Sequence, residues 1–207
     1  MAGQTPLVIT LWETYGSNME AVAEALAADL KLPLHKQAYS SEAIEEATAE
    51  REREGALGRL LRNFAPANFT YDGAVSAAAT ASESNYAAMA EENTAVVRQA
   101  ATVGGVIQGR NGQYILRDRP NTLHVKLDGI AERRARRAAE LAGIPFGEAV
   151  KRQELEDDVR VRMSLEAFQW DPRDIEAYDA IVNTSFQDTE ETAQFIAVMA
   201  RVRGGLL

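Results

Sequence analysis

Short apolar segments alternate with amphipathic helical segments along this 207-residue chain. The apolar segments are residues 6–12, 32–37, 104–109, 122–128 and 178–185. The first of them, PLVITLW, is almost continuously apolar, as expected of a strand that is buried on both faces. Strands and helices that alternate in this way predict a parallel sheet covered by helices, with right-handed crossovers. We therefore expect an α/β fold of three layers (α/β/α), with a five-stranded parallel sheet.

The helical segments are recognised by their periodicity and by the residues at their ends. They cover residues 17–30, 41–62, 83–101, 130–143, 146–168 and 188–203, and a long loop is expected at 64–82. Ser17 is a candidate N-cap, and Glu20 three residues later completes a capping-box pattern. Gly143 is a candidate C-cap because glycine readily adopts the left-handed conformation that ends many helices. These signals divide the chain into short elements, and none of them requires a second domain.

Composition excludes several classes of function. The net charge of −9 argues against nucleic acid or an anionic membrane as the partner. The chain has no cysteine, which excludes disulfides, thiolate metal sites and cysteine nucleophiles. His35 and His124 lack the spacing of metal ligands, so no metal site is expected. No signal-peptide core and no apolar run of membrane-spanning length are present, so we expect a cytoplasmic protein.

The turn WETYGSNME follows the first strand and precedes the first helix, where a phosphate-binding loop normally lies. A working loop reads G-x-x-x-x-G-K followed by a hydroxyl residue, because backbone N–H groups and the lysine hold the phosphates. On this chain the two glycine positions are Glu13 and Asn18, and the lysine position is Met19. Only Gly16 and Ser17 keep the expected character. The turn is either a degenerate phosphate-binding loop or a simple strand-to-helix connection.

Several segments together resemble one known family. VITLWETYGSNMEAVAEALAADLKLPL is similar to ITISREYGSGGREIAKKLAEELGIPF, and VIQGRNGQYILRDRPNTLHVKL is similar to VIVGRGANYILRDRPNVLHVFL. LEDDVR fits a D-x-x-R lid motif, and WDPRDIEAYDAIVNTS fits a W-x-DP…YDLxINTS ending. The quoted patterns are those of the cytidylate kinase-like family, and they occur here in the family's order.

This resemblance implies a nucleoside monophosphate kinase fold, with the first strand at the centre of the sheet, and it assigns functions to separate parts of the chain. It implies a single kinase-like domain over 1–207, an acceptor-side helical and loop insertion at 36–82, and a helical lid at 146–172. The activity would be ATP-dependent phosphoryl transfer to a nucleoside monophosphate such as CMP, or to a related small acceptor. ATP and Mg²⁺ would be the cofactors, and a nucleotide or another phosphorylated small molecule would be the partner.

The resemblance also implies roles for individual residues. Arg110 would contact the acceptor phosphate, and Arg160 and Arg162 would close on it from the lid, because a guanidinium binds two phosphate oxygens at once. The expected phosphate-binding residues are Tyr15, Gly16, Ser17, Asn18, Met19, Gly109 and Arg110. The alternatives stay open: Arg110 could pair with a carboxylate at its strand end. Arg152, Asp157 and Arg160 could form an internal ion-pair ladder.

Two carboxylates weaken the expectation of catalysis. Glu13 and Glu20 stand where the family pattern has arginines. One like-charge contact at about 5 Å costs roughly 3 kcal/mol at an effective dielectric near 20, whereas a helix N-terminus returns about 0.3–1 kcal/mol. We therefore expect attenuated or lost phosphoryl transfer. The alternative is a non-catalytic pseudokinase that acts as a regulatory or protein-interaction module through 36–82. The chain could also form a homo-oligomer.

Three further features have structural interpretations. The basic cluster RRARR at 133–137 is interpreted as a solvated helix face. Asp128 ends a strand and could hold a metal, but we assign it none. Trp12 stands where the family pattern has a small polar residue, so its indole should fill space close to the expected phosphates.

Overall fold

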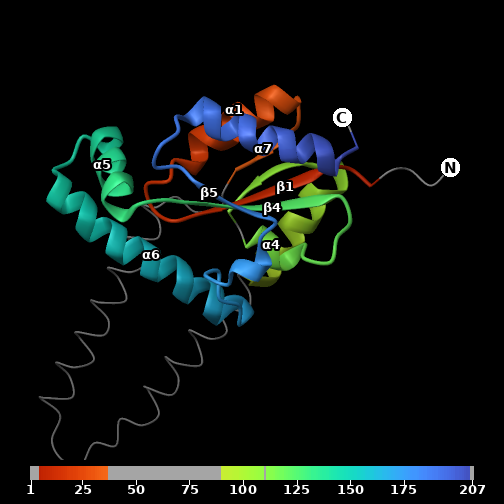
Figure 1. Ribbon diagram of the computed structural model, residues 1–207. Helices are drawn as coiled ribbons and strands as arrows, with labels where there is room; N and C mark the ends of the chain where they lie inside the picture. Colours follow the sequence, from red (N-terminus) through yellow and green to blue (C-terminus); the bar gives the residue numbers. More distant parts are fainter. Residues whose placement is uncertain (1–4, 37–89, 110, 206–207) are drawn as a thin grey trace, which may run out of the picture.

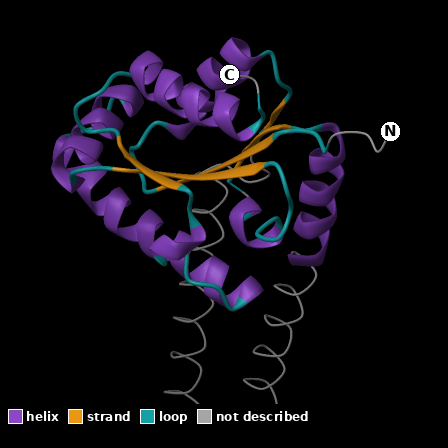
Figure 2. Ribbon diagram, turned by 45° about the vertical axis from the view of Figure 1, so that its right-hand side comes forward, coloured by secondary structure: helices purple, strands orange, loops and turns teal. Residues whose placement is uncertain are grey.

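The computed structural model describes residues 5–36, 90–109 and 111–205, which form a parallel sheet with helices on both sides (Figures 1 and 2). The strands are β1 (Val8–Glu13), β2 (Leu34–His35), β3 (Gly105–Gln108), β4 (Thr122–Asp128) and β5 (Ala180–Asn183). Their order is β2-β3-β1-β4-β5, and every neighbouring pair is parallel. The predicted five-stranded parallel sheet with a central first strand is therefore confirmed.

The described helices follow the predicted segments closely. They are α1 (Met19–Leu30), a helix over 90–103, α4 (Gly112–Ile115), α5 (Ala131–Ala142), α6 (Phe146–Phe168) and α7 (Thr189–Arg203), with a 3₁₀ turn at Ile175–Ala177. The predicted span 146–168 matches α6 at both ends, and Gly143 caps α5 in a left-handed conformation as predicted. The short helix α4 was not predicted. The predictions for 41–62, for 64–82 and for the first residues of 83–101 lie outside the described residues.

Two apolar clusters fill the spaces between the layers. Successive residues of a strand point to opposite faces, so Ile9 and Leu11 of β1 pack toward α1 and α7, together with Leu26 and Ile196 of those helices. Val8 points the other way, toward the helix over 90–103 and the region of α4. Figure 1 shows α1 and α7 side by side over one face and α4 below the other. Both faces of the sheet are thus covered.

The start of α1 differs from the prediction. Asn18, and not Ser17, is the N-cap residue, with a left-handed φ of 66° and no side-chain capping bond. Ser17 is buried, and its hydroxyl lies 3.1 Å from that of Thr14. Glu20 is exposed and pairs with Lys36 at 3.2 Å. The predicted Ser17–Glu20 capping box is therefore wrong, because the loop turns the serine inward and the glutamate outward.

Within the described ranges, no helix combines the length and the apolar character that a bilayer crossing would require.

Candidate functional site

The loop of residues 14–18 joins β1 to α1 at the carboxyl edge of the sheet. In parallel α/β sheets this edge is where ligands bind. Gly16 adopts φ 78°, and a Cβ built there would lie 2.3 Å from the carbonyl oxygen of Arg134. A side chain at this position would collide with the backbone of α5. The loop therefore requires glycine here, because α5 packs directly against it.

The side chain of Glu13 occupies the N-terminus of α1. Its Oε2 accepts a hydrogen bond of 2.9 Å from the backbone N–H of Met19, the first residue of that helix. The unpaired N–H groups and the dipole of a helix N-terminus attract an anion, which in phosphate-binding loops is the phosphate. In this chain the protein's own carboxylate takes that place.

Burial makes the Glu13 carboxylate an unusual one. Only 15% of its side chain is accessible, and desolvation raises its pKa above the ordinary value. The charge of Arg160, whose Nη2 lies 3.8 Å from Oε1, and the Met19 N–H oppose this shift without overcoming it. A buried carboxyl group with a displaced pKa is typical of functional sites, since such groups are costly to keep for stability alone.

A second carboxylate reaches the loop from α6. The backbone N–H of Tyr15 donates to Oδ1 of Asp157 at 2.6 Å, and Oδ2 of Asp157 lies 3.1 Å from Nη1 of Arg134. The N–H of Tyr15 in the loop is therefore bonded to a carboxylate of α6, and the N–H of Met19 at the start of α1 to a carboxylate of β1. This arrangement holds α6, the predicted lid helix, against the loop.

Two arginines of α5 bind the opposite side of the loop. Nη1 of Arg134 donates to the carbonyl of Tyr15 at 2.7 Å, and Nη1 of Arg137 donates to the carbonyl of Gly16 at 3.1 Å. Arg134 is buried, and desolvation lowers the pKa of the half-buried Arg137 guanidinium. The interpretation of 133–137 as a solvated face is therefore wrong for these two residues. Sequence reasoning missed them because charge patterning does not reveal which helix will pack on the loop.

The structure brings one predicted lid arginine to the loop and turns the other away. Arg160 pairs with Glu156 at 2.8 Å and approaches Glu13. Arg162 lies on the exposed side of α6, where it pairs with Asp158. The expected clamp therefore keeps only Arg160 close to the loop, and a phosphate contact by Arg160 stays a prediction.

The predicted ladder of Arg152, Asp157 and Arg160 is wrong in its partners. Arg152 pairs with Glu148 at 3.5 Å. Asp157 pairs instead with Arg134 of α5, while Arg160 pairs with Glu156 in the preceding turn of α6 and approaches Glu13 of β1. These contacts across elements fix the position of α6, which a ladder within one helix would not do.

Arg110 lies outside the described residues, but its two neighbours are described. Gly109 directly follows β3 with φ 65°, and its N–H donates to the carbonyl of Leu11. Oδ1 of Asn111 accepts a hydrogen bond of 2.7 Å from the hydroxyl of Ser164 in α6. The segment that follows β3 is thus connected to the same helix that supplies Asp157 to the loop.

Comparison with known proteins places this chain in a family. The model of the cytidylate kinase-like family matches residues 8–186. The chain belongs to the cytidylate kinase-like family. This agrees with the motifs in the sequence and with the three-layer architecture described above.

Two further proteins are similar to this cytidylate kinase-like chain, one in sequence and one in structure. A protein named uronate isomerase, from Corynebacterium glutamicum, is 34% identical over 119 residues, which are 56% of this chain but only 23% of that protein. The chain thus spans less than a quarter of that relative. An uncharacterized protein from Eubacterium ventriosum has a similar structure, with a TM-score of 0.64 and 19% identity over 94% of this chain and 98% of that chain. That likeness supports the fold alone.

Proteins of the kinase-like family generally use ATP and Mg²⁺, but the residues at this loop do not fit that pair. Met19, at the position of the phosphate-binding lysine, is 3% accessible and packs in the core. Glu13 and Asp157 occupy N–H groups that would hold phosphate oxygens. No group of three or more histidine or carboxylate residues suitable for a metal occurs among the described residues.

Asp128, the remaining candidate metal ligand, is held by other groups. Its Oδ1 accepts hydrogen bonds of 2.8 Å from the Thr14 hydroxyl and from the N–H of Gly129. Lys126 lies 3.6 Å and Arg134 3.7 Å from its two oxygens. Two neighbouring cations disfavour a third positive charge beside this carboxylate.

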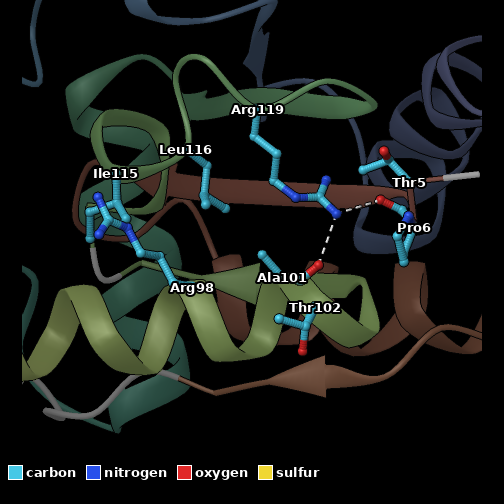
Figure 3. Close-up of a pocket in the computed structure, with 8 residues that line it drawn as sticks. All are labelled: Thr5, Pro6, Arg98, Ala101, Thr102, Ile115, Leu116 and Arg119. Carbon is cyan, nitrogen blue, oxygen red and sulfur yellow. Dashed lines mark hydrogen bonds between the residues drawn. The ribbon is translucent and has the colours of Figure 1, made fainter.

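A separate hollow of about 590 Å³ lies at the amino-terminal edge of the sheet (Figure 3). Arg119 lines it and donates at 2.8 Å each to the carbonyls of Pro6 and Ala101. Its other bonds go to residues 120–122. The guanidinium therefore connects the segments that precede three strands, which is a structural role.

Proposed function

We propose that this cytidylate kinase-like chain binds a nucleoside monophosphate, or a related phosphorylated small molecule, and transfers phosphate from ATP slowly or not at all. The observation that carries the proposal is the hydrogen bond of 2.9 Å between the Met19 N–H and Glu13. It places a negative charge of the protein where a bound triphosphate would have to lie.

Charge arithmetic supports the loss of ATP binding. A phosphate oxygen about 5 Å from Glu13 would meet a repulsion of roughly 3 kcal/mol. With no lysine at Met19, nothing at that position neutralises the β and γ phosphates. Because each 1.36 kcal/mol changes a rate about tenfold, a deficit of several kcal/mol would lower the rate of transfer by several powers of ten.

The acceptor side supports retained binding of a monophosphate. The Gly109–Arg110 motif resembles the family pattern that contacts the acceptor phosphate. Asn111 is bonded to Ser164 of α6, so the segment after β3 and the helix that carries Arg160 are connected. A monophosphate bound there would not need the N–H groups that Glu13 and Asp157 occupy.

A thermal-shift panel of nucleoside mono-, di- and triphosphates, each with and without Mg²⁺, tests the proposal. A ligand that binds only the native state stabilises it, by about 2.7 kcal/mol at a hundredfold excess over Kd. We expect a monophosphate to raise the Tm and ATP to leave it unchanged, with or without Mg²⁺. Turnover near the 1–100 per second typical of kinases, measured with CMP and ATP in a coupled assay, would overturn the proposal.

A second candidate function is a non-catalytic interaction module. The sequence predicts the contact at 36–82, of which the structure describes only residue 36. The described part offers a different surface on α7, where Phe195, Val198 and Val202 are each more than half exposed. Their spacing puts them on one side of the helix, and exposed apolar stripes often mark contacts between proteins. On this candidate function, the natural chain should self-associate with rising concentration in sedimentation, and Phe195→Ser should abolish that association while leaving nucleotide binding unchanged.

A further inference from the structure

One face of β4 is polar although the strand lies inside a covered sheet. Thr122, His124 and Lys126 alternate along it, and all three are buried. Strands of parallel sheets that are covered on both faces are normally apolar on both. A buried polar group without a partner is costly, so each of these side chains should have a partner.

The first two have partners within the fold. The His124 ring nitrogen Nδ1 lies 2.8 Å from the hydroxyl of Thr10 on the neighbouring strand. The Thr122 hydroxyl accepts a hydrogen bond of 3.1 Å from Arg119. Neither group therefore requires a ligand.

Lys126 differs from both. Its side chain is only 8% accessible, and its ammonium forms an ion pair with Asp128 at 3.6 Å, but it donates no hydrogen bond to any residue that the structure describes. The ammonium faces two aromatic rings, with 5.1 Å to the centroid of Trp12 and 5.9 Å to that of Tyr178. Rings stabilise a cation by their quadrupole, but they do not use its three N–H donors.

The carboxylates near Lys126 are shared with other groups. Asp128 also binds Thr14 and the N–H of Gly129. Asp171, whose charge interacts with Lys126, is bound by Arg173 at 2.7 Å. The charge of the ammonium is therefore only partly neutralised within the fold, and its donors can take oxygens from outside it.

The position of Lys126 relates it to the loop. It is paired in register with Trp12, one residue before Glu13, at the carboxyl edge of the sheet. Because side chains alternate along β1, Trp12 and Glu13 point to opposite faces. An anion at Lys126 would thus lie on the other face of the sheet from the Glu13 carboxylate.

We propose that Lys126 is a phosphate-binding residue of this chain, with Trp12 and Tyr178 beside it as an aromatic frame. Its ammonium would bind the phosphate of a small phosphorylated ligand on the face of the sheet opposite the Glu13 carboxylate. The inference rests on the proposed function only for the nucleoside part of the ligand, since the phosphate part follows from Lys126 itself.

Calorimetry with inorganic phosphate, ribose 5-phosphate and CMP tests this assignment on the full chain. Lys126→Met keeps the length and the apolar contacts of the side chain but removes its charge. We expect it to weaken the binding of all three ligands about tenfold or more, the scale of 1.4 kcal/mol. The matched control Lys151→Met removes the same charge from an exposed position of α6 and should leave binding unchanged. Asp128 keeps Arg134, the Thr14 hydroxyl and the Gly129 N–H as partners when Lys126 is replaced, so the Tm of the Lys126→Met variant should fall only slightly.

Chemical rescue provides a second arm if that variant fails to fold. The chain has no cysteine, so Lys126→Cys can be alkylated at one site with 2-bromoethylamine in denaturant and then refolded. This restores an ammonium at nearly the same distance from the backbone. We expect the unmodified variant to bind phosphate weakly and the aminoethylated one to recover.

The outcomes separate this inference from the proposed function. If CMP binds equally well to the natural chain and to Lys126→Met, Lys126 is not the phosphate-binding residue and the proposed function stands. If phosphate and ribose 5-phosphate bind through Lys126 but CMP binds no better, the assignment holds and the nucleoside part of the proposed function fails. Absence of phosphate binding by the natural chain, or failure of the rescue, overturns the assignment.

Discussion

Glu13 and Met19 are joined by a hydrogen bond of 2.9 Å from the backbone N–H of Met19 to the carboxylate of Glu13. The sequence suggested that the two residues weaken phosphate binding independently. Glu13 would repel the phosphates by its charge, and Met19 lacks the positive charge of the lysine that it replaces. The structure shows that the two residues are linked, because the Glu13 carboxylate caps the N-terminus of α1 and the Met19 side chain packs in the core. The loop is thus completed by the protein's own groups.

Replacing Glu13 with glutamine should make stability less dependent on pH. The raised pKa of Glu13 means that the folded state binds its proton more tightly than the unfolded state does. Stability from this group is therefore complete below the unfolded pKa of about 4.3 and is lost as pH rises through the folded pKa. Glutamine keeps an acceptor for the Met19 N–H and does not ionise. Urea unfolding should show Glu13→Gln more stable than the natural chain at pH 8, with the difference vanishing in acid.

The control for that series is Glu20→Gln, which removes a charge from an exposed ion pair with Lys36. Exposed pairs contribute about 0–1 kcal/mol, and this variant should follow the natural chain at every pH. A Glu13→Gln variant that is less stable than the natural chain at pH 8 would show that the ion pair with Arg160 outweighs the cost of burial.

Restoring the missing lysine should destabilise the protein. Met19 is almost completely buried among apolar side chains, so Met19→Lys would place an ammonium in the core. We expect a loss of about 3 kcal/mol or more in the free energy of unfolding, because the penalty for a buried unpaired charge is several kcal/mol. Met19→Leu, which conserves volume, should cost less than about 1.5 kcal/mol. A Met19→Lys variant of natural stability that binds ATP would show that the side chain can turn toward the loop.

Adjacent aspartates of α6 should respond differently to the same substitution. Asp157 bonds the Tyr15 N–H and pairs with the buried Arg134, whereas Asp158 pairs with the exposed Arg162. Asp157 is partly accessible, so Asp157→Asn should cost about 1–3 kcal/mol, less than the 3–5 kcal/mol for breaking a fully buried pair. Asp158→Asn should cost under about 1 kcal/mol. Equal losses in denaturant unfolding would mean that α6 is not held to the loop through Asp157.

Two glycines with similar backbone angles should differ in their tolerance of alanine. Gly16 and Gly143 have φ of 78° and 65°, but a Cβ at Gly143 meets no atom within 4 Å, whereas one at Gly16 collides with Arg134. Gly143→Ala should therefore cost about 1–2 kcal/mol, the strain of the left-handed conformation. Gly16→Ala should add roughly 1–3 kcal/mol for the displacement of α5. Similar Tm values for the two variants would contradict the close packing of loop and helix.

Arg110 and Arg162 test the acceptor side. Arg110→Ala should weaken the binding of a nucleoside monophosphate by about 1.5–3 kcal/mol, the scale of a hydrogen bond to a charged group. Arg162→Ala should leave affinity unchanged, because Arg162 faces away from the loop and pairs with Asp158. Isothermal calorimetry measures both, and unchanged affinity in the Arg110 variant would remove that residue from the site.

The elements of the fold were predictable because their signals are local. Apolar runs and helical periodicity predicted where the strands and the helices lie. The predicted ends of the helix at 146–168 and the predicted C-cap at Gly143 match the structure to the residue. The same local reasoning failed at Ser17, where a capping pattern competes with the turn of the loop. Three-residue spacing cannot reveal which side chain the backbone turns inward.

The environment of each charged residue was decided by the tertiary structure. Arg134 and Arg162 both lie in highly charged helices, yet one is buried against the loop and the other is exposed. Glu13, Asp157 and Lys126 come from distant parts of the sequence and gather at one edge of the sheet. The sequence by itself determined which segments form strands and helices along the chain, since apolar periodicity is a property of neighbouring residues. Only the packing of α5 and α6 on the loop determined which charged side chains are buried. Burial removes water from a charged group and disfavours its charged form, so a buried carboxylate or ammonium needs partners nearby.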